Sequence, residues 1–220
     1  MKVLITGSRG VIGTVLMRGL SGAKTGFDLP DGDTRAFEPL VERLRGHDAV
    51  IHLAWNNIEV GSDPDAHHVD NLRQVLNIYR AAAAAGVPRI VMASSVHADS
   101  FVGRAADRLL SPHELPLPNG PYGAAKVFME ALGRFYADSE GLEVVCIRFG
   151  GVNRDDRPPP VPPSERQVWL SHADCVDLVQ RCLDATTIPG RHLVVYAVSD
   201  NADRRHDVSN PLGWQPRPRR

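Results

Sequence analysis

The sequence predicts an α/β fold, a Rossmann-type doubly wound parallel sheet with a small C-terminal substrate-binding extension. Short apolar runs alternate along the chain with longer stretches in which apolar residues recur at helical spacing. This alternation is typical of a parallel sheet with helices wound onto both faces. In addition, the turn TGSRGVIG follows the first apolar run directly and opens the first helical stretch, as in dinucleotide-binding folds.

Six segments are predicted to form strands. Each is a short run rich in apolar residues, as expected for strands that are covered on both faces. In chain order they are residues 2–6, 25–29, 48–54, 89–95, 142–150 and 191–198.

Helical spacing predicts most of the segments between the strands. Proline suits the first turn of a helix that begins at Pro121, and Gly86 with Pro88 is a stop signal for the helix before it. The predicted helices are residues 11–20, 36–45, 67–85, 121–138 and 172–185.

The composition excludes several classes of protein. A net charge of −1 gives no reason to expect a nucleic acid or an anionic membrane as partner. No apolar run approaches the ~20 residues that span a bilayer, and the first residues lack the features of a signal peptide. The three cysteines lie in apolar segments and the histidines show no metal-ligand spacing. We therefore expect a cytoplasmic protein that holds no metal.

The glycine turn predicts a site for the pyrophosphate of a dinucleotide. Gly7, Gly10 and Gly13 allow a tight turn, a close approach of the backbone to phosphate and close packing of helix on strand. Asp28, at the end of the second predicted strand, is placed to bind the adenosine ribose. Its carboxylate would repel a 2′-phosphate, which favours NAD over NADP, whereas Arg9 in the loop is an argument for NADP. A purely structural glycine turn is the alternative.

We expect a single domain, residues 1–220, with an NAD-binding core over 1–150 and a small substrate-binding part over 151–220. The prolines of segment 153–167 exclude the interior of a regular helix or strand there. This segment follows the carboxyl end of a strand, where open α/β sheets bind ligands. It is either a surface loop or a lid over a substrate.

The stretch PYGAAK places Tyr122 and Lys126 four residues apart, on one face of the helix that begins at Pro121. Ser95 ends the strand over 89–95, and so would converge with this pair at the carboxyl edge of the sheet. Two polar residues on a solvated helix face are the alternative for the pair alone.

With the glycine loop, HLA, ASS and PYGAAK in this order, the chain resembles the extended short-chain dehydrogenase/reductase (NAD-dependent epimerase/dehydratase-like) family over nearly its whole length. Within that family, RIVMASSVHADSF, VWLSHADCVDLV and LGWQP resemble uronate dehydrogenase. The resemblance implies an oxidoreductase that uses NAD to oxidise a hydroxyl of a sugar or sugar acid, as in the oxidation of C1 of an aldose or uronate to a lactone.

The resemblance also implies the catalytic residues Ser95, Tyr122 and Lys126. The Lys126 cation and the positive nicotinamide would lower the pKa of Tyr122, so that the phenolate acts as general base. The residues implied to bind the cofactor are Gly7, Arg9, Gly10, Val11, Ile12, Gly13, Asp28, Leu29, Asp33, Thr34, Leu53, Ala54, Trp55, Asn71, Tyr122, Lys126 and Phe149. For Asn71, a capping role is the alternative.

The residues implied to bind the substrate are Asn57, Ser95, Val96, His97, Tyr122, Gly151 and Arg166. Several of them depart from the family pattern. Val96 stands where uronate dehydrogenases have asparagine, Asn57 and Gly151 stand where they have serine, and Arg166 is only the nearest counterpart of the arginine that grips the sugar carboxylate. The substrate is therefore open, although a carbohydrate-like molecule is expected.

Other functions remain as alternatives. A nucleotide-sugar epimerase or dehydratase would need a longer substrate domain than the roughly seventy residues after Gly150. A ketoreductase or alcohol dehydrogenase of a biosynthetic pathway would use the same residues, and a cofactor-sensing regulator would often lack the Tyr122–Lys126 pair. The resemblance also implies a homodimer through helices 67–85 and 121–138, packed as a four-helix bundle.

Overall fold

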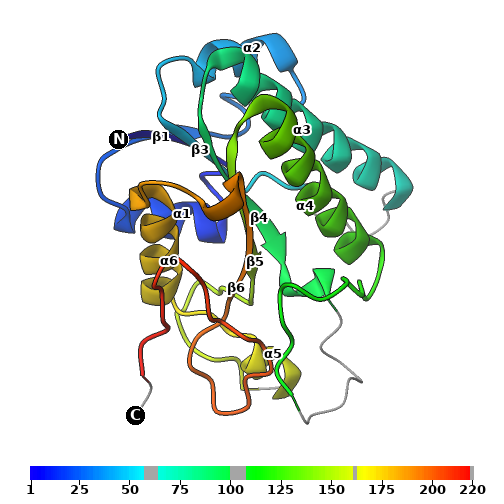
Figure 1. The fold of residues 1–220 in the computed structure, drawn as a ribbon, viewed down its shortest axis with the longest axis vertical. Helices are drawn as coiled ribbons and strands as arrows, with labels where there is room; N and C mark the ends of the chain where they lie inside the picture. The colour runs from blue at the N-terminus through cyan, green and yellow to red at the C-terminus, as the bar shows by residue number, and fades with distance from the viewer. Residues whose placement is uncertain (57–63, 100–107, 161–162, 219–220) are drawn as a thin grey trace.

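The computed structural model describes residues 1–56, 64–99, 108–160 and 163–218. Its centre is a six-stranded sheet in the order β2-β1-β3-β4-β5-β6, in which every neighbouring pair is parallel (Figure 1). The strands are β1 (Lys2–Thr6), β2 (Ala23–Phe27), β3 (Ala49–His52), β4 (Arg89–Ser95), β5 (Glu143–Phe149) and β6 (His192–Ala197).

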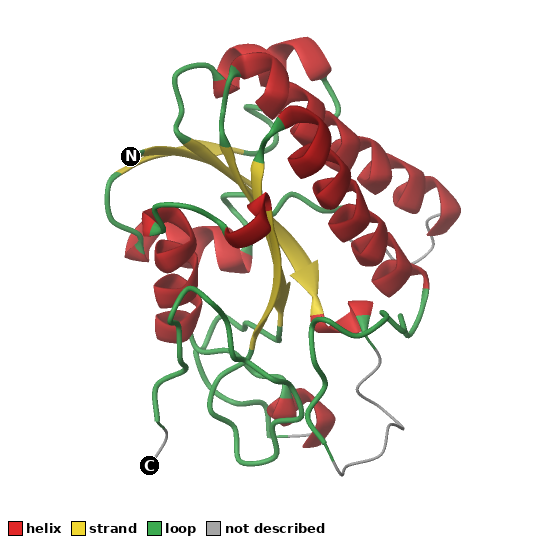
Figure 2. Ribbon diagram, viewed as in Figure 1, coloured by secondary structure: helices red, strands yellow, loops and turns green. Residues whose placement is uncertain are grey.

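Helices cover both faces of this sheet (Figure 2). One core cluster joins the sheet to α1 and α6, and the other joins it to α2, α3 and α4. The bounds are α1 (Val11–Gly19), α2 (Phe37–Leu44), α3 (Pro64–Ala85), α4 (Pro121–Glu140), α5 (Pro163–Gln167) and α6 (His172–Asp184), with short 3-10 helices at η1 (Val96–Ala98) and η2 (Pro189–Arg191). The predicted doubly wound α/β fold is confirmed.

The strands show why their sequences are continuous apolar runs. In β1, Val3 and Ile5 belong to the cluster beneath α1 and α6, whereas Leu4 belongs to the cluster beneath the other three helices. Successive side chains of a strand point to opposite faces, so a strand covered on both faces needs apolar residues at every position.

The strand order places the site. From β1 the chain crosses to β2 on one side and then returns to β3 on the other. The order of the sheet therefore reverses between β1 and β3, and ligands of open α/β sheets bind outside the carboxyl ends of the strands at such a point. The glycine loop after Thr6 and the segment Leu53–Trp55 after His52 lie there.

One expectation about the proline-rich segment is wrong. The prolines predict that residues 153–167 hold no interior of a regular helix or strand, but the last five residues, Pro163–Gln167, form the short helix α5. Proline is compatible with the first position of a helix, because the N–H that it lacks would have no partner within the helix. Among the helices of the described residues, none is long and apolar enough to cross a membrane.

Candidate active site

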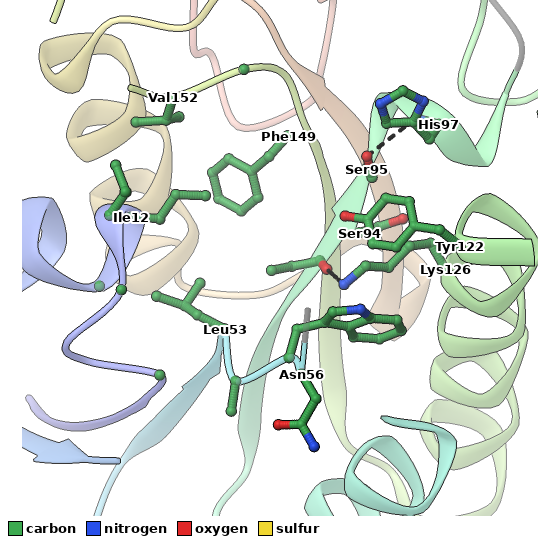
Figure 3. Close-up of a pocket in the computed structure, with 18 of the residues that line it drawn as sticks. Ile12, Leu53, Asn56, Ser94, Ser95, His97, Tyr122, Lys126, Phe149 and Val152 are labelled. Carbon is green, nitrogen blue, oxygen red and sulfur yellow. Dashed lines mark hydrogen bonds between the residues drawn. The ribbon is translucent and has the colours of Figure 1, made fainter. Parts of the chain in front are cut away.

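A cavity of about 1060 Å³ opens at the carboxyl edge of the sheet. Figure 3 shows its two ends: Ile12, Leu53, Phe149 and Val152 gather on one side, and Ser95, His97, Tyr122 and Lys126 on the other. The predicted site residues that line the cavity are Gly7, Gly10, Val11, Ile12, Gly13, Asp28, Leu29, Asp33, Thr34, Leu53, Ala54, Trp55, Ser95, Val96, His97, Tyr122, Lys126, Phe149 and Gly151.

The glycine loop forms a tight cradle at one wall. Gly7 has a φ of +67°, and a Cβ on it would lie 2.7 Å from the backbone nitrogen of Ala54. A Cβ on Gly13 would lie 2.2 Å from the carbonyl oxygen of Gly7. The N-cap of α1, Gly10, offers no side chain to its free N–H groups. These donors and the positive end of the helix dipole therefore suit the pyrophosphate of a dinucleotide.

Asp28 directly follows β2, and backbone N–H groups of the adjacent loops bind its carboxylate. Its carboxylate accepts hydrogen bonds from the backbone N–H groups of Arg9 at 2.8 Å and Leu29 at 2.9 Å, and it lines the cavity. The guanidinium of Arg9 pairs with Asp31 and donates to the Leu29 carbonyl. Arg9 does not line the main cavity but a second groove beside α1 and α6. Because Asp31 pairs with its guanidinium, Arg9 offers little attraction to a 2′-phosphate.

The loop after Asp28 is fixed by polar contacts. Asp33 accepts hydrogen bonds from the Arg35 side chain at 2.8 to 3.1 Å, which holds the pKa of Asp33 below its usual value. Arg35 also pairs with Asp70 of α3 at 3.0 Å. The hydroxyl of Thr34 donates to Gln74 at 2.6 Å. The segment expected to contact adenine is thus tied to α3.

Ser95, Tyr122 and Lys126 converge at the other end of the cavity. The Ser95 hydroxyl oxygen accepts from the backbone N–H of His97 at 3.2 Å. Lys126 donates from Nζ to the carbonyl of Ala93 at 2.8 Å. Gly123 permits this convergence, because a Cβ there would lie 2.0 Å from the His97 carbonyl oxygen. The start of α4 can therefore pack directly against η1.

The ionisation of this set differs from the expectation. Burial raises the pKa of Tyr122, and a hydrogen bond with Ser95 only partly opposes it. Burial lowers the pKa of Lys126 to about 7, and Glu130 opposes that shift. The expectation that Lys126 lowers the pKa of Tyr122 is not met by the side chains alone, because burial of the phenol dominates.

Three predicted residues do not line the cavity. Asn71, buried on α3, accepts from the Asn56 N–H at 2.7 Å and donates to the Asn56 carbonyl at 2.9 Å. It therefore fixes the backbone of Asn56, which itself lines the cavity. Arg166 lies in a separate groove with Pro158 and neighbouring residues. Arg9 lies in the groove beside α1 and α6. Asn57 lies outside the described residues.

Other lining residues had not been predicted. Asn119 lines the cavity, and its Nδ2 lies 2.8 Å from His97 Nδ1. Its position just before PYGAAK is the sequence feature that could have indicated a role in the site. From the segment after β5, Val152, Asn153, Pro159, Ser164 and Glu165 reach the cavity, as do Val168 and Trp169. The β-bridge between Gly151 and Trp169 holds this segment against the cavity. No local sequence pattern predicts that bridge. The described residues contain no cluster of His, Cys, Asp or Glu that could hold a metal.

Known proteins are similar to this chain in sequence and in structure. The L-arabinose 1-dehydrogenase (NAD(P)(+)) of Haloferax volcanii is 31% identical over 98% of this chain and 96% of its own length. The uronate dehydrogenase of Pseudomonas putida is 31% identical over 98% of this chain and 84% of its own. A variant of uronate dehydrogenase from Agrobacterium tumefaciens, solved in complex with NAD, has a TM-score of 0.81 and 26% identity over 99% of this chain and 84% of that one.

These similarities confirm the resemblance that the motifs indicated. A family model, described as the NAD dependent epimerase/dehydratase family, matches residues 3–152. The match spans the glycine loop, Asp28, Ser95, Tyr122 and Lys126, which are the residues that meet in the cavity. The chain therefore belongs to the NAD dependent epimerase/dehydratase family.

Proposed function

We propose that the protein is an NAD-dependent oxidoreductase that oxidises a hydroxyl of a sugar or sugar acid, with C1 of an aldose or uronate, oxidised to a lactone, as the foremost case. The observation that carries this proposal is the joint placement of the Ser95–Tyr122–Lys126 set and the glycine cradle in one cavity. Relatives that span nearly the whole chain are named for oxidation at arabinose C1 and of uronates.

The protein residues divide the chemistry between them. When bound, NAD supplies the acceptor for the hydride that leaves the alcohol carbon. As the phenolate, which the positive charge of a bound nicotinamide would favour over the neutral phenol, Tyr122 removes the hydroxyl proton as general base. Ser95 holds the substrate oxygen by a hydrogen bond. Lys126 supplies positive charge beside the phenol and a donor for the ribose of the cofactor. The fixed positions of Ser95 at the end of β4 and Lys126 against Ala93 supply the required orientation.

The lining of the substrate end favours a neutral aldose over a uronate. Polar groups reach it from Asn119, His97, Asn153 and Ser164, and Glu165 brings a carboxylate. Of the arginines that the structure describes, only Arg35 lines the cavity, and it is bound to Asp33 and Asp70. A sugar carboxylate would thus meet a negative charge and no free arginine among these groups.

The assay that tests this proposal mixes the purified protein with NAD and a panel of neutral aldoses and uronates, and follows the absorbance of reduced NAD. We expect net reduction, faster with an aldose than with the uronate of the same configuration. Conversion of a nucleotide sugar without net reduction would instead support an epimerase or dehydratase. Binding of NAD with no turnover of any sugar would indicate a regulator.

We also infer a homodimer through α3 and α4. These helices pack on each other and expose Val69 and Leu76 on one and Phe128 and Phe135 on the other. Each pair is seven residues apart, so it lies on one stripe of its helix. Two copies would bury this apolar surface as a four-helix bundle. Light scattering should give the mass of a dimer, and Phe128→Glu with Phe135→Glu should give a monomer.

Two further proposals concern the chain as a whole. We propose that residues 1–220 form one cooperative domain, since β6 from the C-terminal part completes the sheet that β1 begins; a single unfolding transition tests it.

We also propose that the protein is cytoplasmic, because Cys146, Cys175 and Cys182 are all buried and free, as suits a reducing compartment. Fractionation of the source cells tests that location.

A further inference from the structure

The ammonium of Lys126 lies in a site that other residues complete. Lys126 is only 4% exposed. Its Nζ donates to the Ala93 carbonyl at 2.8 Å and lies 3.6 Å from the centre of the Trp55 ring. The Trp55 ring also meets the Tyr122 ring edge-on, at 5.6 Å between centres. The face of an indole attracts a cation, most strongly where water is excluded.

A carboxylate lies one helical turn further along α4. Glu130 is buried and accepts two hydrogen bonds from Arg148 of β5, each of 2.8 Å. It also accepts a hydrogen bond of 2.5 Å from the hydroxyl of Ser94, the neighbour of Ser95. Arg148 in turn donates to the hydroxyl of Tyr196 at 3.0 Å. The sheet register aligns Ser94 with Arg148, and Arg148 with Tyr196, so one row across three strands holds Glu130.

Burying the Glu130–Arg148 ion pair costs free energy of folding, so stabilising the fold is a poor explanation of the pair on its own. The desolvation of two buried charges often exceeds their mutual attraction, and a pair of apolar side chains of similar volume would often serve as well or better. The Glu130–Arg148 pair lies beneath the proposed catalytic set, where Lys126 has lost almost all of its water. A negative charge fixed one helical turn from a buried ammonium offsets part of that loss.

We propose that Trp55 and Glu130 are positioning residues for Lys126: the indole face holds the ammonium from the cavity side, and the carboxylate of Glu130 stabilises its charge within the fold. This inference deepens the proposed function, because it rests on the role given there to Lys126. Neither residue needs to touch the substrate for this role. Trp55 also limits where the Tyr122 ring can lie, since the two rings are in edge contact.

The charged and titratable groups around Lys126 agree with this assignment. Burial lowers the pKa of Lys126 to about 7, and Glu130 is the group that raises it. His52, at the end of β3, has its pKa lowered to about 3 by burial and by Lys126, so it stays neutral. Tyr122 on α4 is a neutral phenol near pH 7, because burial raises its pKa. Arg148 faces Glu130 from β5. Glu130 is thus the anion that acts on Lys126.

The chain offers a direct way to observe this lysine. It contains only three lysines, Lys2, Lys24 and Lys126. In protein labelled with [6-13C]lysine, the Cε signals can be followed by NMR against pH, and Lys126 is the signal lost in Lys126→Arg. The measurement needs neither substrate nor turnover. Failure of the proposed function would appear in the sugar assay, and failure of this inference would appear in the titration.

For Glu130 we expect the midpoint of the Lys126 titration to fall by about one pH unit or more in Glu130→Gln. The matched control is Glu143→Gln, which breaks the other glutamate–arginine pair of β5, with Arg89, and should leave the midpoint unchanged. If Glu130→Gln does not fold, the double variant Glu130→Met with Arg148→Met replaces the pair by apolar side chains and should show the same direction. A midpoint unchanged in the variant that folds would overturn the role of Glu130.

For Trp55 we compare the midpoint of the Lys126 titration in two variants that weaken the ring to different degrees. Leucine removes the ring, and phenylalanine keeps a weaker one, so we expect the midpoint to fall by about half a unit to one unit in Trp55→Leu and by less in Trp55→Phe. An unchanged midpoint would show that the ring does not stabilise the ammonium. A rise would show that Trp55 only shields Lys126 from water, and would equally overturn its assigned role.

Discussion

Strand β5 carries one residue of a glutamate–arginine pair near each end, and the two pairs differ in burial and in surroundings: Glu143 is partly exposed, whereas Glu130 and Arg148 are both buried. At the amino end, Glu143 pairs with Arg89, which also donates to the carbonyls of Leu183 at 2.7 Å and Ala185 at 2.6 Å. Those carbonyls belong to the end of α6, so this pair completes a helix terminus. At the carboxyl end, Arg148 pairs with Glu130, one helical turn from Lys126.

The comparison separates what holds the fold from what serves the site. The same two residue types act at both ends, but only the carboxyl end meets the glycine loop, Ser95 and Tyr122. In parallel sheets the carboxyl edge is where ligands bind. Changes at the amino end should therefore alter stability and spare turnover, whereas changes at the carboxyl end should alter turnover or the ionisation of Lys126.

The largest expected effect is at the carboxyl end. Tyr122→Phe should lower kcat by up to about 10⁴-fold while NAD binding persists, because the ring remains and only the group that takes the proton is lost. Steady-state kinetics and a cofactor titration measure the two quantities. The matched control is Tyr136→Phe on the same helix, where the ring stacks on Tyr79 and activity should persist. Turnover retained in Tyr122→Phe would remove Tyr122 as the base.

At the amino end, Arg89→Met should lower the free energy of unfolding by about 3 kcal/mol, because the partly buried Glu143 loses its partner. The last carbonyls of α6 also lose their donor. Urea unfolding measures this effect, and kcat/KM of the folded protein should stay at the value of the parent. Arg45→Met breaks the exposed pair with Glu42 and should change stability by less than about 1 kcal/mol. Equal effects from both variants would contradict the comparison.

Lys126 itself should cost stability. Its pKa is about 7 in the fold and 10.5 as the ordinary value, so the unfolded chain binds more protons between these two values. The contribution of Lys126 to the free energy of unfolding therefore becomes more favourable to the fold as pH rises from about 7 towards 10. Lys126→Met should raise the free energy of unfolding near pH 7 by about 1–3 kcal/mol and remove that part of the pH dependence. A variant that is less stable at pH 7 would contradict the prediction.

The smallest of these effects concerns the cofactor. Asp28→Ala should weaken NAD binding by about tenfold, since one charged acceptor for the ribose is lost. Calorimetric titration measures the affinity. Asp31→Ala is the matched control, because it removes a neighbouring carboxylate that pairs with Arg9 and does not line the cavity. If both variants bind NAD as the parent does, the ribose contact lies elsewhere.

The sequence predicted those parts of the molecule that depend on local signals. Strands covered on both faces, the glycine turn and the spacing of Tyr122 and Lys126 each appear within a few adjacent residues. Contacts set by register do not. The row of Ser94, Arg148 and Tyr196 follows from the alignment of three strands, and no one segment contains it.

Packing explains the remaining differences. Gly123 is needed because α4 meets the backbone of His97, a contact between distant segments. The fall in the Lys126 pKa reflects burial, which the helix alone could not indicate. The short helix α5 does not follow from the proline content, because prolines exclude the interior of a helix but are compatible with its first position, which Pro163 occupies.

The measurement that tests the central claim most directly follows deuterium from the sugar. An aldose carrying deuterium at C1 is incubated with the protein and NAD, and the cofactor and the sugar product are analysed by mass spectrometry. The account predicts one deuterium in each reduced NAD and a lactone or aldonate that has lost it. Deuterium retained in the sugar, with oxidised NAD recovered at the end, would contradict oxidation at this carbon.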